Sequence, residues 1–352
     1  MYGIGQNLEN RVAVVTGASA GVGRATAIAL AEAGVHVGVI ARHEEGLAEV
    51  ARLVESHGVR CAPVSCDVAD AEGMIAAADR ISEALGPIDI WVNCAMATVF
   101  ARFEDIAPDE YARVTNVCYL GMVNGTRAAL RHMRPRDRGL ILQVGSALAY
   151  RSIPLQSPYC GAKHAIVGFT DSLRSELLKE KSSITITAVH LPAVNTPQFA
   201  WGRAHVDYEP RPAGTPVAPE VAGEAIVSAI RNPRRDYWLG LQTAQAILGG
   251  MVAPGLLDRF LAWTAYEGQF GPDRLDEDRP DNLFTPVGSV DRERGPYADE
   301  EKGSAVLVSG AAARFALAGV VVGALVGAGF ALRAGARNGN RLPRPPARRA
   351  MR

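Results

Sequence analysis

The chain of 352 residues lacks several features that mark whole classes of protein. Its 37 Lys and Arg residues balance 37 Asp and Glu residues, so no net charge draws it toward nucleic acid. Its five cysteines form no CxxC pair and no His cluster accompanies them, which argues against a metal site and predicts reduced thiols. The first residues hold no apolar signal core, so we expect a cytoplasmic catalytic domain.

Short apolar runs alternate with longer helical stretches. Val12–Thr16 is typical of a strand buried on both faces. Further strands are expected at 35–41, 60–65, 88–93, 140–144 and 184–190, and helices around 24–33, 44–57, 71–85, 109–133, 159–180 and 219–231. This alternation predicts βαβ units and an α/β fold, a Rossmann-like doubly wound parallel sheet in a single large domain.

The rest of the chain predicts appendages to a sheet domain at residues 1–240. Residues 192–218 contain five prolines and predict a loop that covers a site. Residues 241–270 predict an extra helical lobe. Residues 271–304 are rich in charge, proline and glycine and predict a poorly packed linker.

An uncharged stretch of eighteen residues, Phe315–Leu332, lies near the C-terminus. That length is at the short end of what crosses a bilayer. Gly319, Gly323 and Gly327 recur at every fourth position, which suits close helix pairing in a membrane. We therefore expect a transmembrane or membrane-associated helix over 305–332, followed by an Arg-rich tail at 333–352.

The orientation of this segment stays open. The arginines that follow it favour a cytoplasmic tail, and the catalytic domain is expected on the same side. One straight span cannot satisfy both. Either the charge rule is broken, or the segment lies in the membrane plane with its tail on anionic lipid. A third possibility is an oligomerisation helix without lipid contact.

A glycine-rich turn follows the first predicted strand and opens a helix, with the sequence Thr16-Gly17-Ala18-Ser19-Ala20-Gly21-Val22-Gly23. Glycines let the backbone approach a pyrophosphate closely, and the helix start offers free N–H groups and a positive dipole end. Such a turn alone also serves ordinary loops. The strand before it and the helix after it predict a dinucleotide site.

Tyr159 and Lys163 open another predicted helix four residues apart, so they share one face. A phenol has a pKa near ~10, and a nearby ammonium lowers it, which prepares Tyr159 for proton transfer. Ser146 follows a predicted strand, at the sheet edge where active sites form, and can donate to a substrate oxygen. Taken singly, each residue is also an ordinary turn serine, aromatic helix start or surface charge.

These motifs together resemble the short-chain dehydrogenase/reductase family over roughly residues 8–240. The resemblance implies an NADP-binding Rossmann domain at 1–240 and catalysis by Asn116, Ser146, Tyr159 and Lys163, with Asn116 holding a water in a proton relay. It implies cofactor contacts from Thr16, Gly17, Ser19, Gly21, Val22, Gly23, Arg42, Asp67, Val68, Asn93, Ala95, Tyr159, Lys163, Pro192 and Thr196. Met96 and Ala193 depart from the family pattern, which has glycine at both positions.

The end of the second predicted strand bears on cofactor choice. NAD enzymes place a carboxylate there for the ribose 2′-hydroxyl, which would repel a 2′-phosphate. This chain has Ala41, followed by Arg42, whose guanidinium suits a phosphate. The sequence predicts NADP(H), with NAD(H) as the alternative.

The resulting hypothesis is an oxidoreductase that interconverts a carbonyl and an alcohol on a small apolar substrate. Leu148, Tyr150, Ile153, Pro154, Leu155, Phe199 and Trp201 flank the predicted site and either line a pocket or pack in the core. The rival is a non-catalytic NADP(H)-binding sensor or scaffold at a membrane, which the Asn-Cys-Ala-Met departure at 93–96 favours. The family resemblance also implies a homo-oligomer that pairs through the helices 109–133 and 159–180.

Overall fold

The structure is a computed structural model that describes residues 6–276, 278–288 and 293–319. The chain divides into two compact units, residues 1–310 and 311–352. Within the second unit, the described residues 311–319 are helical.

The described residues of the first unit form an eight-stranded sheet in the order β12-β10-β7-β6-β4-β1-β2-β3. Neighbouring strands are parallel, except that β12 runs antiparallel to β10 at one edge. The strands are β1 (Val12–Thr16), β2 (His36–Ala41), β3 (Cys61–Ser65), β4 (Ile90–Asn93), β6 (Leu140–Ser146), β7 (Thr185–Leu191), β10 (Asp236–Leu239) and β12 (Leu307–Ser309).

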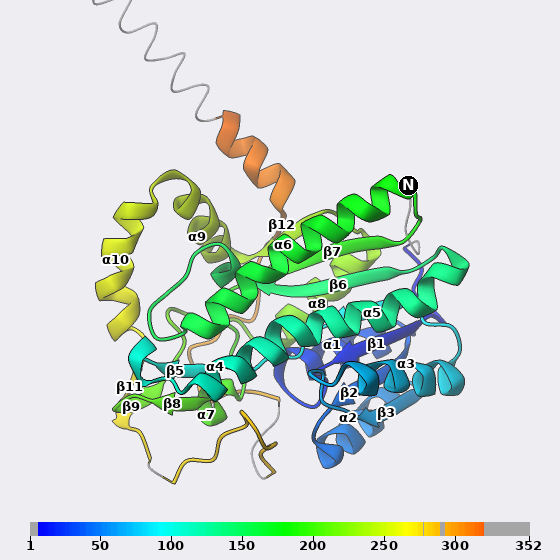
Figure 1. Cartoon of the computed structure of the whole chain (residues 1–352), viewed down its shortest axis with the longest axis horizontal. Helices are drawn as coiled ribbons and strands as arrows, with labels where there is room; N and C mark the ends of the chain where they lie inside the picture. The colour runs from blue at the N-terminus through cyan, green and yellow to red at the C-terminus, as the bar shows by residue number, and fades with distance from the viewer. Residues whose placement is uncertain (1–5, 277, 289–292, 320–352) are drawn as a thin grey trace, which may run out of the picture. The chain divides into compact units, whose positions relative to one another are not determined.

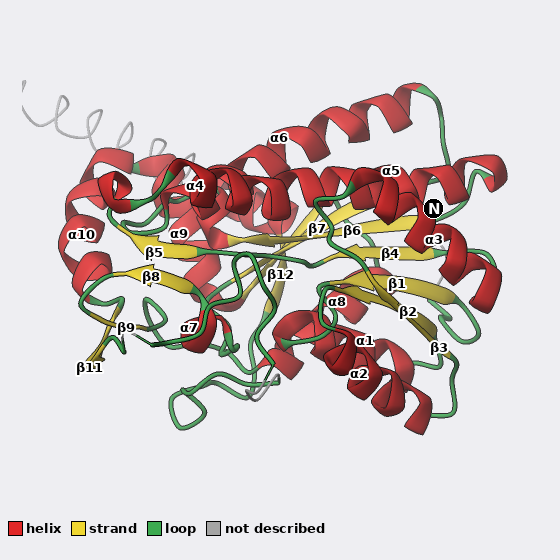
Figure 2. Cartoon of the chain, turned by 60° about the horizontal axis from the view of Figure 1, so that its bottom comes forward, coloured by secondary structure: helices red, strands yellow, loops and turns green. Residues whose placement is uncertain are grey.

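Helices cover both faces of this sheet (Figure 2). One face carries α1 (Gly21–Glu32), α2 (Glu44–Ser56) and α8 (Pro219–Arg231). The other carries α3 (Ala71–Leu85), α4 (Pro108–Thr115), a π-helical turn (Asn116–Leu120), α5 (Gly121–Met133) and α6 (Ser157–Lys179).

Each face of the sheet has its own hydrophobic core. In β1, Val15 belongs to the core under α1, α2 and α8, and its neighbour Val14 belongs to the core on the opposite face. Successive strand residues point to opposite faces, so a strand covered on both sides is apolar throughout. The prediction of a Rossmann-like doubly wound sheet from continuous apolar runs is confirmed.

The chain changes direction across the sheet after β3. Strands β1, β2 and β3 run toward one edge, and β4 then returns to the other side of β1. A crevice opens at such a switch point, outside the carboxyl ends of the strands. The glycine-rich turn after β1 and the loop after β4 both lie at this point.

Further elements extend the domain beyond the sheet (Figure 1). The segment expected as an extra helical lobe forms two helices, α9 (Gly240–Val252) and α10 (Pro254–Glu267). Two small sheets pair β5 with β8 and β9 with β11. Their bounds are β5 (Val99–Ala101), β8 (Arg203–His205), β9 (Tyr208–Pro210) and β11 (Phe270–Arg274), and a short helix α7 (Gln198–Trp201) precedes β8.

The segment 271–304 packs against the domain more closely than its composition predicts. Leu283 is fully buried and belongs to the core on the face of the sheet that carries α3 to α6. Arg279 donates to the carbonyl oxygens of Phe199 and Ala200, and Arg203 forms an ion pair with Asp281. The expectation of a poorly packed linker is wrong for these residues, because their charges are paired within the fold instead of solvated.

No helix among the described residues is long and apolar enough to cross a bilayer. Most of the stretch 315–332 and all of the Arg-rich tail fall within 320–352, outside the described residues. Within the described part of the segment 305–332, where a membrane helix was predicted, residues 307–309 form the edge strand β12 and residues 310–319 are helical.

Candidate active site

A pocket with a volume of about 700 Å³ follows the carboxyl edge of the sheet. It runs from the glycine-rich turn and the end of β2, past Ser146 and Tyr159, to the helices α9 and α10. Its size lies within the range usual for sites that bind small molecules.

The glycine-rich turn leaves its backbone open to close contact with a ligand. A Cβ on Gly17, which has φ +68°, would lie 2.7 Å from the Cα of Ala95. A Cβ on Gly23 would lie 2.2 Å from the carbonyl oxygen of Gly17. The start of α1 follows directly, and its N-cap residue Ala20 makes no side-chain capping hydrogen bond. This end of the pocket therefore offers backbone N–H groups and a positive dipole end to an anion.

Thr16 and Asn93, both expected to contact the cofactor, lie behind the pocket wall. The Thr16 hydroxyl accepts hydrogen bonds from the backbone N–H groups of Cys94 (3.0 Å) and Ala95 (3.3 Å). The buried Asn93 amide donates to Thr126 (3.0 Å) and Gln143 (2.9 Å). Both residues position the loop after β4, and Ala95 and Met96 of that loop line the pocket.

Asp67 and Val68 line the end of the pocket expected to hold adenine. Arg113 on α4 donates to Asp67 Oδ2 at 2.6 Å. Burial alone would raise the pKa of Asp67, but the hydrogen bond from Arg113 and the nearby charge of Arg42 hold it below its ordinary value. The Asp67 carboxylate is therefore ionised and fixed in place.

Arg42 contacts a segment far away in the sequence, residues 281–287, which we name the strap. Its Nη1 donates to the carbonyl oxygens of Phe284 (2.9 Å) and Leu283 (3.3 Å), and its Nη2 donates to that of Asn282. Arg113 Nε also donates to Leu283 O at 3.0 Å. Burial, and then the charge of Arg113, lower the pKa of Arg42. Arg42 lines the pocket as expected, but it also holds the strap.

The strap itself forms part of the pocket, because Asn282, Pro286 and Val287 line it. Sequence reasoning missed these residues. The one local signal was Leu283, an apolar residue within a charged stretch.

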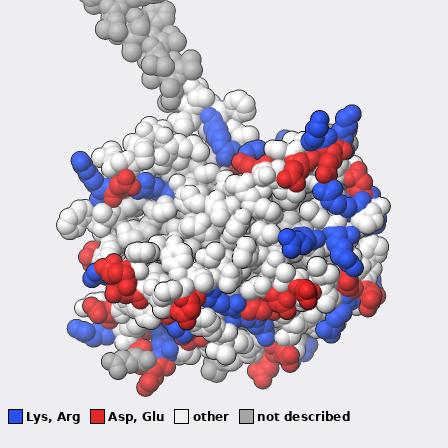
Figure 3. Space-filling view, in the orientation of Figure 1, with Lys and Arg blue, Asp and Glu red and all other residues white. Residues whose placement is uncertain are grey.

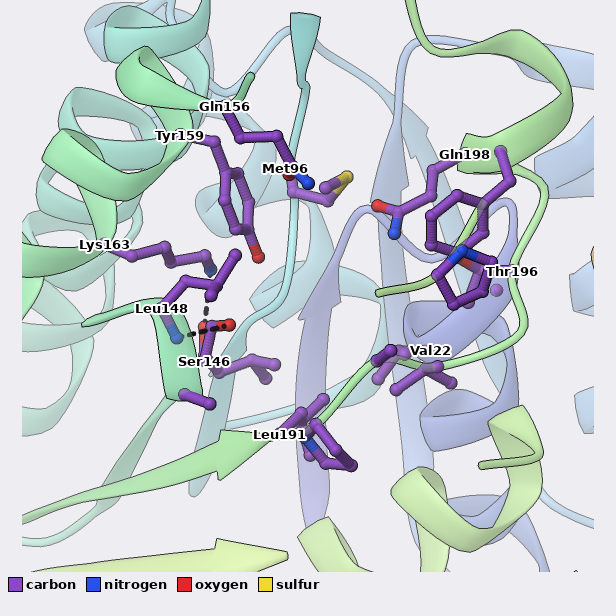
Figure 4. Close-up of a pocket in the computed structure, with 18 of the residues that line it drawn as sticks. Val22, Met96, Ser146, Leu148, Gln156, Tyr159, Lys163, Leu191, Thr196 and Gln198 are labelled. Carbon is purple, nitrogen blue, oxygen red and sulfur yellow. Dashed lines mark hydrogen bonds between the residues drawn. The ribbon is translucent and has the colours of Figure 1, made fainter. Parts of the chain in front are cut away.

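Ser146, Tyr159 and Lys163 meet in the middle of the pocket (Figure 4). Ser146 ends β6 and caps the short helical turn Ala147–Ala149, where its hydroxyl accepts from Leu148 N at 3.1 Å. Tyr159 and Lys163 lie in the first turns of α6, with Lys163 Nζ 5.5 Å from the centre of the Tyr159 ring. In Figure 4 the Tyr159 hydroxyl points toward the open centre of the pocket.

Burial dominates the acid–base properties of this group. Loss of solvent raises the pKa of the Tyr159 phenol well above its ordinary value, although a hydrogen bond with Ser146 offsets part of the rise. The same loss of solvent lowers the pKa of Lys163. The lowering of the Tyr159 pKa that the sequence predicted from Lys163 is not found in the free protein, because desolvation is the larger effect.

Asn116, expected as the fourth catalytic residue, does not join the other three. It is exposed at the start of the π-helical turn and does not line the pocket. Cys118, two residues later, is fully buried near Tyr159 and Lys163, and burial raises the pKa of its thiol. Two helical residues differ by roughly 200° in direction, so the two side chains point opposite ways.

The substrate end of the pocket is mainly apolar. Of the flanking residues expected from the sequence, Leu148, Ile153, Phe199 and Trp201 line it, whereas Tyr150, Pro154 and Leu155 do not. Sequence reasoning did not identify seven further lining residues: Leu257, Phe260, Leu261 and Thr264 of α10, and Arg151, Gln156 and Gln198.

The remaining expected contacts, Ser19, Gly21, Val22, Pro192 and Thr196, all line the pocket. The pocket thus brings together a dinucleotide-type turn, a Ser-Tyr-Lys group and an apolar chamber.

Known proteins similar to this chain include oxidoreductases and short-chain dehydrogenases. The chain is 32% identical over 292 residues to the uncharacterized oxidoreductase YxnA of Bacillus subtilis, covering 82% of each protein. A short chain dehydrogenase of Mycobacterium paratuberculosis bound to NAD is 29% identical, with a TM-score of 0.52, over 54% of this chain and 75% of that one. A variant of actinorhodin polyketide ketoreductase with NADPH is 32% identical, with a TM-score of 0.52, over 55% and 74%.

The family profile for short chain dehydrogenases matches residues 11–205, which include the glycine-rich turn, Ser146, Tyr159 and Lys163. The chain belongs to the short-chain dehydrogenase/reductase family of oxidoreductases.

Proposed function

We propose that this oxidoreductase interconverts a carbonyl and an alcohol on a small apolar substrate with NADP(H), using Tyr159 as the acid and base. The observation that carries the proposal is the meeting of the Tyr159 hydroxyl, Ser146 and Lys163 in one pocket with the glycine-rich turn.

The residues present fit a nicotinamide dinucleotide. The uncapped start of α1 and the missing Cβ atoms of Gly17 and Gly23 leave room for a pyrophosphate against the backbone. Ser19, Gly21 and Val22 would hold the pyrophosphate, Asp67 and Val68 the adenine, Lys163 the nicotinamide ribose, and Pro192 and Thr196 the carboxamide. The bound cofactor supplies or accepts a hydride.

The side chains around the substrate oxygen handle the proton. During reduction, Tyr159 donates its hydroxyl proton to the carbonyl oxygen. Ser146 donates a hydrogen bond to the same oxygen as negative charge develops on it. The raised pKa of Tyr159 keeps the phenol protonated at neutral pH, so its proton is available for the reduction step.

The preference for NADP(H) rests on the end of β2. Ala41 brings no carboxylate that would repel a 2′-phosphate, and Arg42 lines the pocket beside it. Solved relatives bound to NAD and to NADPH both resemble this chain, so NAD(H) is the alternative.

The experiment is consumption of NADPH and NADH against a panel of ketones, aldehydes and sterols. We expect turnover with NADPH on apolar carbonyls, because Leu148, Ile153 and Phe199 offer the substrate no charge. No turnover with any carbonyl or alcohol, despite measurable NADPH binding, would contradict the proposal.

A second candidate is a sensor or scaffold that binds NADP(H) without turnover. The burial of Cys118, instead of Asn116, beside Tyr159 and the presence of Met96 in the loop after β4 favour it. The same panel separates the two functions, since a sensor binds the cofactor and leaves every substrate unchanged.

Two further proposals concern assembly. We propose membrane association through 315–332, which fractionation of the full chain and of a chain ending at Gly310 would test; equal partition of the two would contradict it. We also propose a cytoplasmic homo-oligomer that pairs through the helical segments 109–133 (α4 to α5) and 159–180 (α6). A monomeric mass in light scattering would contradict that.

A further inference from the structure

The helix pair α9–α10 carries a concentration of exposed apolar side chains. Six large residues are at least half exposed, and Trp263 reaches 78%. We name them the apolar hairpin face: Leu241, Met251, Val252, Leu256, Phe260 and Trp263. Soluble monomers rarely expose so many large apolar residues in one place, so this face is expected to meet another apolar phase.

Charge is scarce on this helix pair. Helix α9 has no charged residue, and α10 has Asp258, Arg259 and Glu267. Asp258 is neutralised by Arg151, whose Nη2 lies 2.5 Å from its carboxylate. Figure 3 shows the surface around α9 and α10, at the upper left, as uncharged apart from one small cluster.

The inner side of the same helix pair forms the wall of the substrate pocket. Leu257, Phe260 and Leu261 of α10 line the pocket, and so does Ala246 of α9. Phe260 belongs to both surfaces, because it lines the pocket and is 58% exposed. An apolar surface therefore continues from the outside of the molecule into the catalytic chamber.

Two contacts fix the helix pair over the site. Arg151 binds Asp258 and also donates to the carbonyl oxygen of Pro254 at 3.4 Å. The buried Gln269, just after α10, donates to Pro154 O at 3.0 Å and accepts from Gln156 at 2.7 Å. Both contacts reach the segment 151–156, directly before Tyr159 on the chain. The hairpin is thus a fixed part of the site.

We propose that the apolar hairpin face docks on the surface of a lipid membrane and that apolar substrates enter the pocket from the lipid. The entry route rests on the proposed function, whereas the docking does not. A protein partner seated on Phe260 and Trp263 would close the side of the pocket that this surface leads into, but a fluid lipid layer leaves it open. Tryptophan favours the membrane interface, and exposed Arg259 beside it suits anionic headgroups.

The four tryptophans of the chain make a direct test possible. Trp91, Trp201 and Trp238 are buried, and Trp263 is exposed. Full-length protein is mixed with phosphatidylcholine–phosphatidylglycerol vesicles whose acyl chains carry bromine, which quenches tryptophan on contact. We expect quenching in the native protein and none in Trp263→Phe. Vesicle binding without quenching of Trp263 would overturn the proposal, because another part of the chain would then make the contact.

A matched pair of variants tests the affinity. Leu256→Ser with Trp263→Ser removes two apolar contacts outside the pocket lining, and we expect vesicle affinity to fall about tenfold or more. Phe103→Ser with Leu178→Ser changes residues of similar exposure elsewhere, at 70% and 72%, and should leave the affinity unchanged. Equal loss in both pairs would overturn the proposal. So would burial of Trp263 by self-association without vesicles, since a second copy would then be the occupant.

Activity separates this inference from the proposed function. The Leu256–Trp263 double variant should reduce a water-soluble carbonyl like the native protein and lose rate only on a carbonyl presented in vesicles. Equal rates on the vesicle substrate would overturn entry from lipid. Absence of turnover on every substrate would contradict the proposed function, and the quenching result would still decide the docking.

Discussion

Lys163 Nζ lies 5.5 Å from the centre of the Tyr159 ring and donates a hydrogen bond of 2.8 Å to the carbonyl oxygen of Val144. The ammonium of a helix residue is thereby anchored to the end of β6, the strand that also carries Ser146. Strand and helix together fix all three groups before any ligand binds. The consequences for proton transfer and cofactor binding can be measured.

The rate of reduction should be insensitive to pH well into the alkaline range. Reduction needs the protonated phenol, and a raised pKa keeps Tyr159 protonated as pH rises past the ordinary phenol value of about 10. Oxidation needs the phenolate, so its rate should instead climb with pH. Profiles of kcat/KM in both directions test this. A reduction rate that falls near neutral pH would show that another group supplies the proton.

Substitution of Asn116 should leave catalysis almost unchanged, whereas substitution of Cys118 should lower the stability of the protein. Asn116→Ala alters an exposed side chain and should change kcat less than about twofold. Cys118 is fully buried, and its thiol donates to Ala97 O at 3.1 Å, so Cys118→Ala should lower the free energy of unfolding by about 1 kcal/mol. Thermal unfolding and kcat of both variants check this. A severe loss of kcat in Asn116→Ala alone would restore Asn116 to the catalytic group.

Substitutions of Arg42 and Leu283 distinguish the choice between NADPH and NADH from the attachment of the strap. Arg42→Ala removes the cation beside Ala41 together with three hydrogen bonds to the strap, so it should raise the KM for NADPH about tenfold and the KM for NADH by clearly less. Leu283→Ala leaves that cation in place but creates a cavity where the buried Leu283 side chain holds the strap. It should therefore lower the affinity for NADPH and for NADH equally.

Titration calorimetry measures the affinity of each variant for NADPH and for NADH. Equal loss of NADPH and NADH affinity in Arg42→Ala would confine Arg42 to holding the strap.

Gly23 has a matched control in Gly168. A Cβ on Gly23 would lie 2.2 Å from a backbone oxygen, so Gly23→Ala should distort the turn and abolish cofactor binding. Nothing lies within 4 Å of a Cβ on Gly168, inside α6, and Gly168→Ala should bind cofactor normally and be slightly more stable. Normal cofactor binding by Gly23→Ala would contradict the role of the turn.

The fold was largely predictable because both faces of the sheet are buried. Runs such as Val12–Thr16 are apolar throughout, which marks a central parallel strand by composition alone. The glycine-rich turn and the Tyr159–Lys163 pair could also be recognised from the sequence, because each is a local motif. Its residues lie at the short spacing along the chain that brings them together in a turn or on one helix face.

The contacts that sequence reasoning missed join residues far apart on the chain. Arg42 meets the strap more than two hundred residues later, and Phe260 reaches the pocket from an appended helix. The residues around Arg42 and around Phe260 show no pattern that would indicate these distant contacts. Asn116 shows a different difficulty. A shift of two positions along a helix turns a side chain from the pocket to the solvent, and the exposed Asn116 lies two positions before the buried Cys118.

The most direct test of the central claim is single-turnover oxidation of NADPH by a carbonyl substrate in the native protein and in Tyr159→Phe. We expect the rate of the variant to be lower by roughly 10²- to 10⁴-fold, with NADPH affinity unchanged, because only the proton donor is lost. Equal single-turnover rates would contradict the account, since the phenol at the centre of the pocket would then have no part in the reaction.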